Sequence, residues 1–203
     1  LNVESIQTPA YICDRYAFKA NMTDFRSAVR RHYPNYSMGY SYTTNYYPSF
    51  CKAVGELGEY AEIVSPKAYS YAKELGISDS RIIYNGVIPD FENKLIVALN
   101  GGVVNIENID EFIKFVEWSK ANQRELELGV RLNFDIGNGV ISRFGFDVVG
   151  EDFKWLLNKG NYPYIRIKSV HCHISCARSL AFFRKRVQEM VKYSDMLGAS
   201  IID

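Results

Sequence analysis

The sequence lacks the features that mark several common classes of protein. No apolar run approaches the ~18 residues that a membrane-spanning helix requires, and the first residues do not follow the basic-then-apolar pattern of a secretion signal. The 203 residues include only four cysteines, too few for a disulfide scaffold, and carry a net charge of only +1. We therefore expect a cytoplasmic protein with neither nucleic acid nor a membrane among its partners.

A dinucleotide-binding motif is also missing, because no Gly-x-Gly-x-x-Gly follows a predicted strand. What the chain does contain is an alternation of strand and helix patterns joined by short linkers. Such alternation is typical of an α/β protein with right-handed β-α-β units and a parallel sheet. The number of units favours a (β/α)8 TIM-type barrel over an open doubly wound sheet, with roughly the first six to seven units present.

The expected elements cover most of the chain. Strands are predicted at 10–13, 36–42, 61–65, 81–84, 103–106, 128–133, 165–173 and 200–203, and helices at 15–31, 48–57, 66–76, 89–98, 109–118, 151–158 and 178–197. Asp14 is a candidate N-cap, and Pro66 stands at the favoured first position of its helix. In barrels of this kind the chemistry lies at the C-terminal ends of the strands, so the residues that follow the strands are the candidates for a site.

Short motifs at these strand ends resemble the fold-type III pyridoxal phosphate (PLP)-dependent amino-acid decarboxylases, which act on diaminopimelate, ornithine, arginine or carboxynorspermidine. The motifs are TPAYICD at 8–14, AEIVS at 61–65, RIIYNG at 81–86, GVRLN at 129–133, SRFG at 142–145 and VHCHIS at 170–175. The resemblance implies a PLP cofactor, an amino-acid substrate and a homodimer. Residues 1–203 would then be the N-terminal PLP-binding barrel domain, truncated before the phosphate-binding glycine loop and without the C-terminal β-domain.

The segment 40–45, which reads YSYTTN, departs from this family at one position. It resembles Tyr-x-x-Lys-(Ala/Thr)-Asn, in which the lysine forms a Schiff base with the cofactor. Thr43 stands where that lysine is expected, and Thr44 and Asn45 continue the pattern in register, which favours a substitution over a deletion. A hydroxyl cannot form an imine, so we expect no covalent attachment of PLP and an inactive chain, because loss of a covalent catalytic group removes several orders of magnitude in rate.

The histidines at 171 and 173 have two interpretations. The resemblance places the imidazole of His173 flat against the pyridine ring, whereas a lone histidine is more often a core residue satisfied by backbone. His171 points the same way by strand alternation and is expected to line the pocket. Together with Cys172 and Cys176 they offer metal ligands, but Cys172 alternates to the opposite face and no second cluster completes a shell, so we predict no metal site.

The resemblance assigns roles to four further residues. Glu62 falls where the family has an acidic residue near the cofactor, and its alternative is an ordinary solvated carboxylate. Arg131 would lie near the phenolic oxygen of the cofactor, and its alternative is a structural ion pair. Ser175 and Cys176 occupy the Gly and Ser columns of the phosphate-binding turn, although a thiol is a poor donor to phosphate.

Two other enzyme-related interpretations remain. Lys19 lies in a tetrapeptide, FKAN, that looks like the cofactor-lysine segment, but the helical spacing of Met22 and Phe25 continues around it. We therefore do not assign the cofactor lysine to it. The chain as a whole is either a decarboxylase-type protein or a non-catalytic, ligand-binding relative, which Thr43 favours. A PLP-dependent racemase of the same fold is a further alternative, against which the TPAY and HCHI motifs argue.

Overall fold

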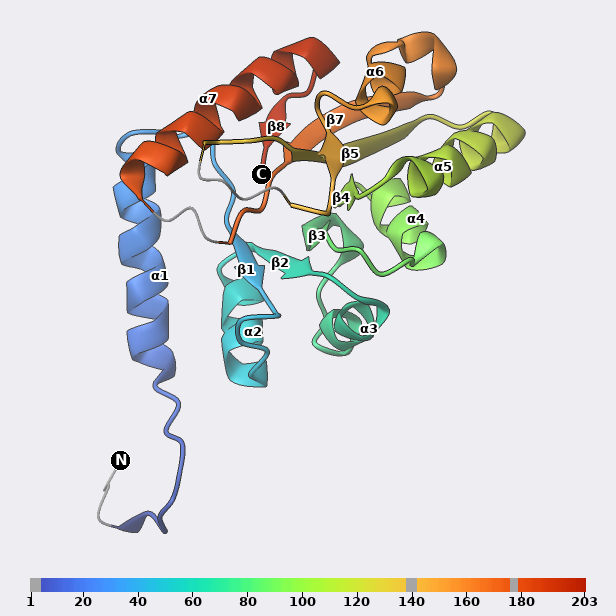
Figure 1. The fold of residues 1–203 in the computed structure, drawn as a ribbon. Helices are drawn as coiled ribbons and strands as arrows, with labels where there is room; N and C mark the ends of the chain where they lie inside the picture. Colours follow the sequence, from blue (N-terminus) through green and yellow to red (C-terminus); the bar gives the residue numbers. More distant parts are fainter. Residues whose placement is uncertain (1–4, 138–141, 176–178) are drawn as a thin grey trace.

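The strands form one curled parallel sheet, and the helices lie around its outer side (Figure 1). This computed structural model describes residues 5–137, 142–175 and 179–203. The strands are β1 Gly39–Ser41, β2 Tyr60–Ile63, β3 Ile82–Tyr84, β4 Val103–Ile106, β5 Leu126–Asn133, β6 Phe146–Asp147, β7 Ile165–His171 and β8 Ile201–Ile202.

The strands pair in the order β1-β2-β3-β4-β5-β7-β8, and β6 pairs with the end of β5. Every pair is parallel, and the order along the sheet follows the order along the chain. A doubly wound sheet would reverse its strand order at a switch point. The observed order therefore confirms the predicted incomplete (β/α)8 barrel and excludes the doubly wound alternative.

Five of the described helices begin at the predicted residue, whereas the helices predicted at 89–98 and 178–197 begin two residues later than predicted. The helices are α1 Arg15–Arg30, α2 Pro48–Glu56, α3 Pro66–Glu74, α4 Phe91–Leu99, α5 Ile109–Asn122, α6 Glu151–Leu157 and α7 Leu180–Leu197, with short 3-10 turns η2 Asp79–Arg81 and η3 Lys159–Asn161. The carboxylate of Asp14 accepts a hydrogen bond from the Ala17 N–H at 2.9 Å, which confirms the predicted N-cap of α1. Pro66 is the first residue of α3 and directly follows the N-cap Ser65.

The first predicted strand, at 10–13, is wrong. These residues are irregular and Tyr11 is fully exposed. The segment extends beyond the N-terminal end of α1 and away from the sheet (Figure 1), so no described strand lies beside it to complete its backbone hydrogen bonds. A short apolar run alone does not specify a strand, because pairing decides whether one forms.

Other boundaries also differ from the predictions. β1 is shorter than the predicted 36–42, and the two-residue strand β6 was not predicted. β7 ends at His171 instead of residue 173, so the in-and-out alternation of a strand does not extend to His173. As a result His171 is buried whereas His173 is exposed.

The layer between the sheet and the helices is apolar and closely packed. Ile63, Ile82, Phe112, Phe115 and Leu156 are each fully buried in it. Seven of the eight residues of β5 are buried, as is typical of a parallel strand that is covered on both faces. This layer holds the strand ends in place for the site.

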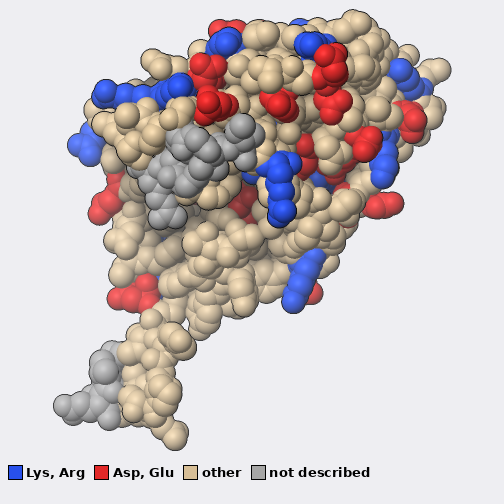
Figure 2. Space-filling model, in the orientation of Figure 1, with Lys and Arg blue, Asp and Glu red and all other residues tan. Residues whose placement is uncertain are grey.

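The surface is mixed in charge. Figure 2 shows acidic and basic side chains interspersed over one face of the molecule, consistent with the net charge of +1. No helix in the described part of the chain is both long enough and apolar enough to cross a membrane.

The inner side of the curled sheet carries a polar layer centred on Asn105, which is 1% exposed. The Ser169 hydroxyl donates to Asn105 Oδ1 at 2.6 Å, and Asn105 Nδ2 donates to Asn85 Oδ1 and to Asp203 Oδ2, both at 2.8 Å. Gly129 leaves the room for this layer, because a Cβ there would lie 1.8 Å from Asn105 Oδ1 and 2.0 Å from Ser169 Oγ. One amide side chain thus links the ends of β3, β4, β7 and β8.

We expect Gly129→Ala to destabilise the fold by about 3 kcal/mol, because the added methyl group separates Asn105 from Ser169 and leaves buried polar atoms unsatisfied. The measurement is the free energy of unfolding in urea. Gly39→Ala is the matched control in β1, since its new Cβ would meet the flexible end of the Ile83 side chain at 3.1 Å and the Glu62 Cβ at an ordinary contact distance of 3.6 Å. We expect the control to stay within about 1 kcal/mol of the wild type; equal effects of the two substitutions would contradict the assignment.

Candidate functional site

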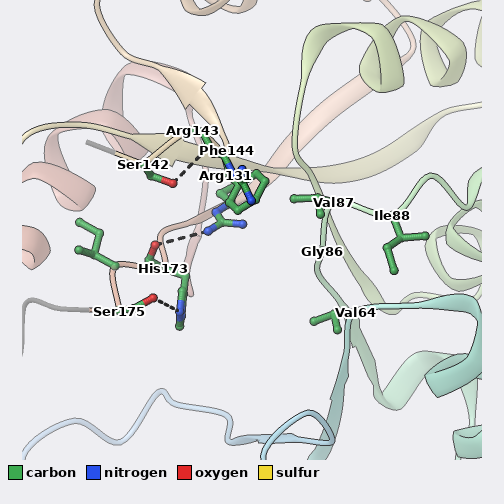
Figure 3. Close-up of a pocket in the computed structure, with 11 residues that line it drawn as sticks. Val64, Gly86, Val87, Ile88, Arg131, Ser142, Arg143, Phe144, His173 and Ser175 are labelled. Carbon is green, nitrogen blue, oxygen red and sulfur yellow. Dashed lines mark hydrogen bonds between the residues drawn. The ribbon is translucent and has the colours of Figure 1, made fainter. Parts of the chain in front are cut away.

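A cavity of about 570 Å³ opens at the C-terminal ends of the strands (Figure 3). Its apolar lining consists of Val64 after β2, Val87 and Ile88 after β3, Phe144 and Ile174. Its polar lining consists of Arg131, Ser142, Arg143, His173 and Ser175. The cavity therefore combines flat and aliphatic walls with two guanidinium groups and an imidazole, a set suited to an anionic aromatic ligand.

Arg131, at the end of β5, is held in a fixed orientation. Its Nη1 donates to both carboxylate oxygens of Glu107, at 2.9 and 3.0 Å, and its Nη2 donates to the backbone oxygen of His173 at 3.4 Å. Arg131 is 9% exposed and Glu107 is 4% exposed. A buried guanidinium with its charge compensated in this way is held rigidly.

His173 lies beyond the end of β7, on the cavity wall that faces Val64 and Gly86 (Figure 3). Its Nε2 is 3.2 Å from the hydroxyl of Ser175. Its own backbone oxygen accepts from Arg131, so the backbone of this turn and the guanidinium are positioned together. Three of the predicted site residues, Arg131, His173 and Ser175, therefore line one cavity.

His171 is buried next to this wall but is not among the residues that line the cavity. Its Nδ1 lies 3.5 Å from Asp203 Oδ2. Burial, and then electrostatic interactions with Arg131 and His173, lower the pKa of His171 to about 3, so the ring is neutral at pH 7. Burial raises the pKa of the Asp203 carboxyl group, while hydrogen bonds from Asn85 and Asn105 oppose that rise.

Thr43 and Glu62 lie on neighbouring strand ends, outside the set of residues that line the cavity. Ser41 and Glu62 are paired in register between β1 and β2. Thr43 is exposed in the turn after β1, and its hydroxyl is 2.7 Å from that of Ser41. Glu62 Oε1 accepts from Asn85 Nδ2 at 3.1 Å, which connects it to the polar layer around Asn105.

No lysine is among the described residues that line the cavity. Lys19 lies on α1 and its ammonium contacts Glu56 at 2.6 Å, on the outer side of the sheet. Cys176, the remaining predicted phosphate contact, lies outside the described residues. Within the described ranges, no three His, Cys, Asp or Glu side chains converge where they could hold a metal ion.

Residues 17–201 match the family described as the pyridoxal binding domain of pyridoxal-dependent decarboxylases. The chain belongs to this family. The match covers nearly every described element, from the first turn of α1 to the start of β8.

Two sequence relatives are diaminopimelate decarboxylases. The protein of Aquifex aeolicus is 26% identical over 208 residues, which cover 96% of this chain and 48% of that protein. The protein of Methanocaldococcus jannaschii is 24% identical over 186 residues, which cover 84% of this chain and 42% of that protein. The chain thus spans about half the length of the relatives that it matches.

Solved structures share the fold. The diaminopimelate decarboxylase of M. jannaschii superposes with a TM-score of 0.81 at 21% identity, over 98% of this chain and 51% of that one. The lysine decarboxylase of Selenomonas ruminantium superposes with a TM-score of 0.66 at 17% identity, over 87% of this chain and 46% of that one. At these identities the likeness is one of fold.

The cavity fits the cofactor that the family name implies. Gly86, with φ +104°, lets the loop after β3 pass against β2, where a Cβ would lie 2.6 Å from the Val64 backbone oxygen. This close approach shapes one wall, and Arg131 with His173 shapes the other (Figure 3). An aromatic ring with anionic oxygens matches such a pair of walls.

Several residues of the site were missed from the sequence. Glu107 forms the ion pair that orients Arg131; it follows a predicted strand and so was a candidate by position, but no role was assigned to it. Arg143 and Phe144 line the cavity, and the SRFG motif that contains them was noted without a role for either. Val87 and Ile88 carried no signal, because exposed aliphatic residues in a loop are common.

The buried neutral state of His171 predicts a pH-dependent stability. Its folded pKa of about 3 lies below the ordinary value of 6.5, so as the pH falls below about 6.5 the unfolded chain binds a proton that the folded chain does not. The stability contributed by His171 is therefore lost as the pH falls from 6.5 toward 3, by at most about 1.4 kcal/mol per pH unit.

We expect His171→Gln to flatten this part of the profile relative to the wild type, measured by urea unfolding between pH 7 and pH 4. The raised pKa of Asp203 changes the stability with pH in the opposite direction, but it does so in both proteins, so the difference between their profiles reports the contribution of His171. His32→Gln, at an exposed histidine, is the control and should keep the wild-type profile. Parallel profiles for His171→Gln and the wild type would contradict the assignment.

Proposed function

We propose that the chain is the cofactor-binding half of a PLP-dependent decarboxylase for diaminopimelate or a similar basic amino acid. The observation that carries the proposal is the cavity at the strand ends, which has His173 on one wall together with the buried Arg131, whose charge is compensated by Glu107. Membership of the pyridoxal-binding family and the names of the diaminopimelate decarboxylase relatives support the reaction and the substrate class.

The residues of the chain have separate roles in this proposal. PLP, when bound, supplies an electron sink for the negative charge left by loss of CO2. The imidazole of His173 would pack against the bound ring and hold its plane, and the Arg131 guanidinium would stabilise an anionic ring oxygen. Ser175 and Cys176 are assigned to the phosphate group, and Glu62 to the hydrogen bonds near the reacting end. His171 supports the wall as a neutral, buried group.

Thr43 is the position at which this chain lacks a group that the reaction of the family requires. A hydroxyl cannot replace the amine of the family's lysine, and no lysine stands among the described cavity residues. We infer that PLP binds this chain reversibly and without a covalent bond. This observation also favours the second candidate function, a ligand-binding relative without catalytic turnover.

The organisation of the whole protein is part of the proposal. We infer that residues 1–203 form one pyridoxal-binding barrel domain of a longer, cytoplasmic polypeptide, because the relatives are about twice as long. We also infer that the whole protein is a homodimer, a proposal that rests on the family resemblance.

The covalent chemistry is tested by placing a lysine at residue 43. We expect Thr43→Lys, incubated with PLP and reduced with borohydride, to carry a stable adduct on the peptide that contains residue 43, as identified by mass spectrometry. The wild type should yield no adduct in this region, because Thr43 has no amine. Thr44→Lys is the matched control, since Thr44 is also exposed in the same turn. Equal labelling of the two variants would refute Thr43 as the position of the cofactor lysine.

The catalytic part of the proposal is tested in the whole polypeptide that carries this segment. The measurement is the CO2 released from diaminopimelate, lysine, ornithine and arginine. We expect Thr43→Lys to raise the rate by several orders of magnitude over the Thr43 form. Turnover by the Thr43 form that Thr43→Lys does not increase would contradict the role assigned to this position.

The role of His173 is tested through binding alone. We expect His173→Ala to weaken PLP binding by about five- to tenfold, the size of one lost aromatic contact, as measured by equilibrium dialysis of the chain. His32→Ala removes an exposed imidazole elsewhere and should bind as the wild type does. Unchanged binding by His173→Ala would remove this residue from the site.

A further inference from the structure

Lys94, on α4, is a fully buried cation whose contacts lead to the cavity. Its Nζ donates to Glu111 Oε1 at 2.6 Å and to the backbone oxygen of Gly86 at 3.2 Å. The ammonium also lies 5.5 Å from the centre of the Tyr84 ring. Since Gly86 lines the cavity, this hydrogen bond from Lys94 supports one cavity wall from its outer side, away from the cavity.

Glu111, at the start of α5, extends the same contacts to the opposite wall. Its second oxygen, Oε2, accepts from the backbone N–H of Glu107 at 3.4 Å. Glu107 in turn holds the guanidinium of Arg131 through both carboxylate oxygens. A continuous chain of polar contacts therefore runs from the Gly86 backbone through the Lys94–Glu111 pair to Glu107 and Arg131.

We infer that the Lys94–Glu111 ion pair is a positioning element that sets the two walls of the cofactor cavity relative to each other. Neither side chain is among the cavity-lining residues, so both act through Gly86 and Glu107. The cofactor-binding part of this inference rests on the proposed function, whereas the positioning part is a property of the ligand-free chain.

Stability alone does not explain such a pair. Removing two charges from water is costly, and a buried ion pair can often be replaced by apolar side chains of similar volume without loss of stability. An apolar pair, however, cannot bond the Gly86 oxygen or the Glu107 N–H. The feature that only the ion pair supplies is the placement of these two backbone groups, one on each side of the cavity.

The test uses the double variant Lys94→Met/Glu111→Leu, which removes both charges together and leaves neither one buried alone. The matched control is Arg26→Met/Glu59→Leu. In that pair Arg26 Nε contacts Glu59 Oε1 at 2.8 Å, and Glu59 Oε2 accepts from the Met38 N–H at 3.2 Å. The control shares the ion pair and the contact between its carboxylate and a backbone N–H, although Arg26 is more exposed than Lys94. Glu59 precedes β2 and so lies at the opposite end of the sheet.

The first measurement is amide hydrogen exchange in the ligand-free chain. We expect exchange in the double variant to be about tenfold faster at Glu107 and in the loop 86–88, and unchanged there in the control. Lys94→Met/Glu111→Gln restores an oxygen that can accept from Glu107, so it should recover protection at Glu107 but not in the loop. Wild-type exchange at both places in the folded double variant would overturn the proposal.

The second measurement is the dissociation constant for PLP, obtained by equilibrium dialysis. We expect it to rise about tenfold in the double variant, the lower end of what outer supports contribute at metal sites, and to stay at the wild-type value in the control. Wild-type affinity in the double variant would overturn the inference for the cofactor site. If the wild-type chain does not bind PLP, the proposed function fails, and the exchange measurement still decides whether the pair positions the two walls.

If the double variant does not fold, the pair is required for folding. The positioning role is then tested by a milder substitution. That change is Lys94→Arg, which keeps the charge but alters the geometry at the Gly86 oxygen. We expect it to remain folded, with faster exchange in the loop 86–88 and a raised dissociation constant. Wild-type values for both measurements would refute the role.

Discussion

The arrangement of this protein depends on parallel pairing of strands in the order of the chain. Because every strand runs in the same direction, the residues that follow the strands meet at one end of the curled sheet. Thr43, Glu62, Arg131 and His173 come from distant parts of the sequence and reach this end only through that pairing. The cavity is therefore a consequence of topology first and of side-chain chemistry second.

Much of the fold could be predicted from the sequence, because alternation and capping are local signals. The start of α1 follows from Asp14 and the start of α3 from Pro66, and β4 was placed at its observed bounds. The segment 10–13 was mistaken for a strand, since its apolar run said nothing about whether a partner strand lies beside it. The end of β7 was placed two residues too late for the same reason, because the pairing with β8 ends near residue 170.

The site could be predicted only in part. Arg131, His173 and Ser175 were found because short motifs at strand ends are visible in one sequence, and all three line the cavity. Glu107 was a candidate only by its position after a strand, and Lys94 was not predicted at all, because a charged residue in a sequence is normally expected to be solvent-exposed. Their burial results from contacts across strands and helices that are distant in the chain, such as Lys94 with Glu111 and Glu107 with Arg131.

The polar layer around Asn105 also has a consequence for how the chain folds. Neighbouring strands along the chain pair with each other, so most of the sheet can assemble one unit at a time as successive strands are added. The bonds from Asn105 to Ser169 and Asp203 instead join residues separated by 64 and 98 positions. They can form only after β7 and β8 have joined the sheet, so closing these loops carries the largest entropic cost. The side chain of Asn105 therefore completes its hydrogen bonds late in folding, only when the curled sheet has formed as far as its last described strand.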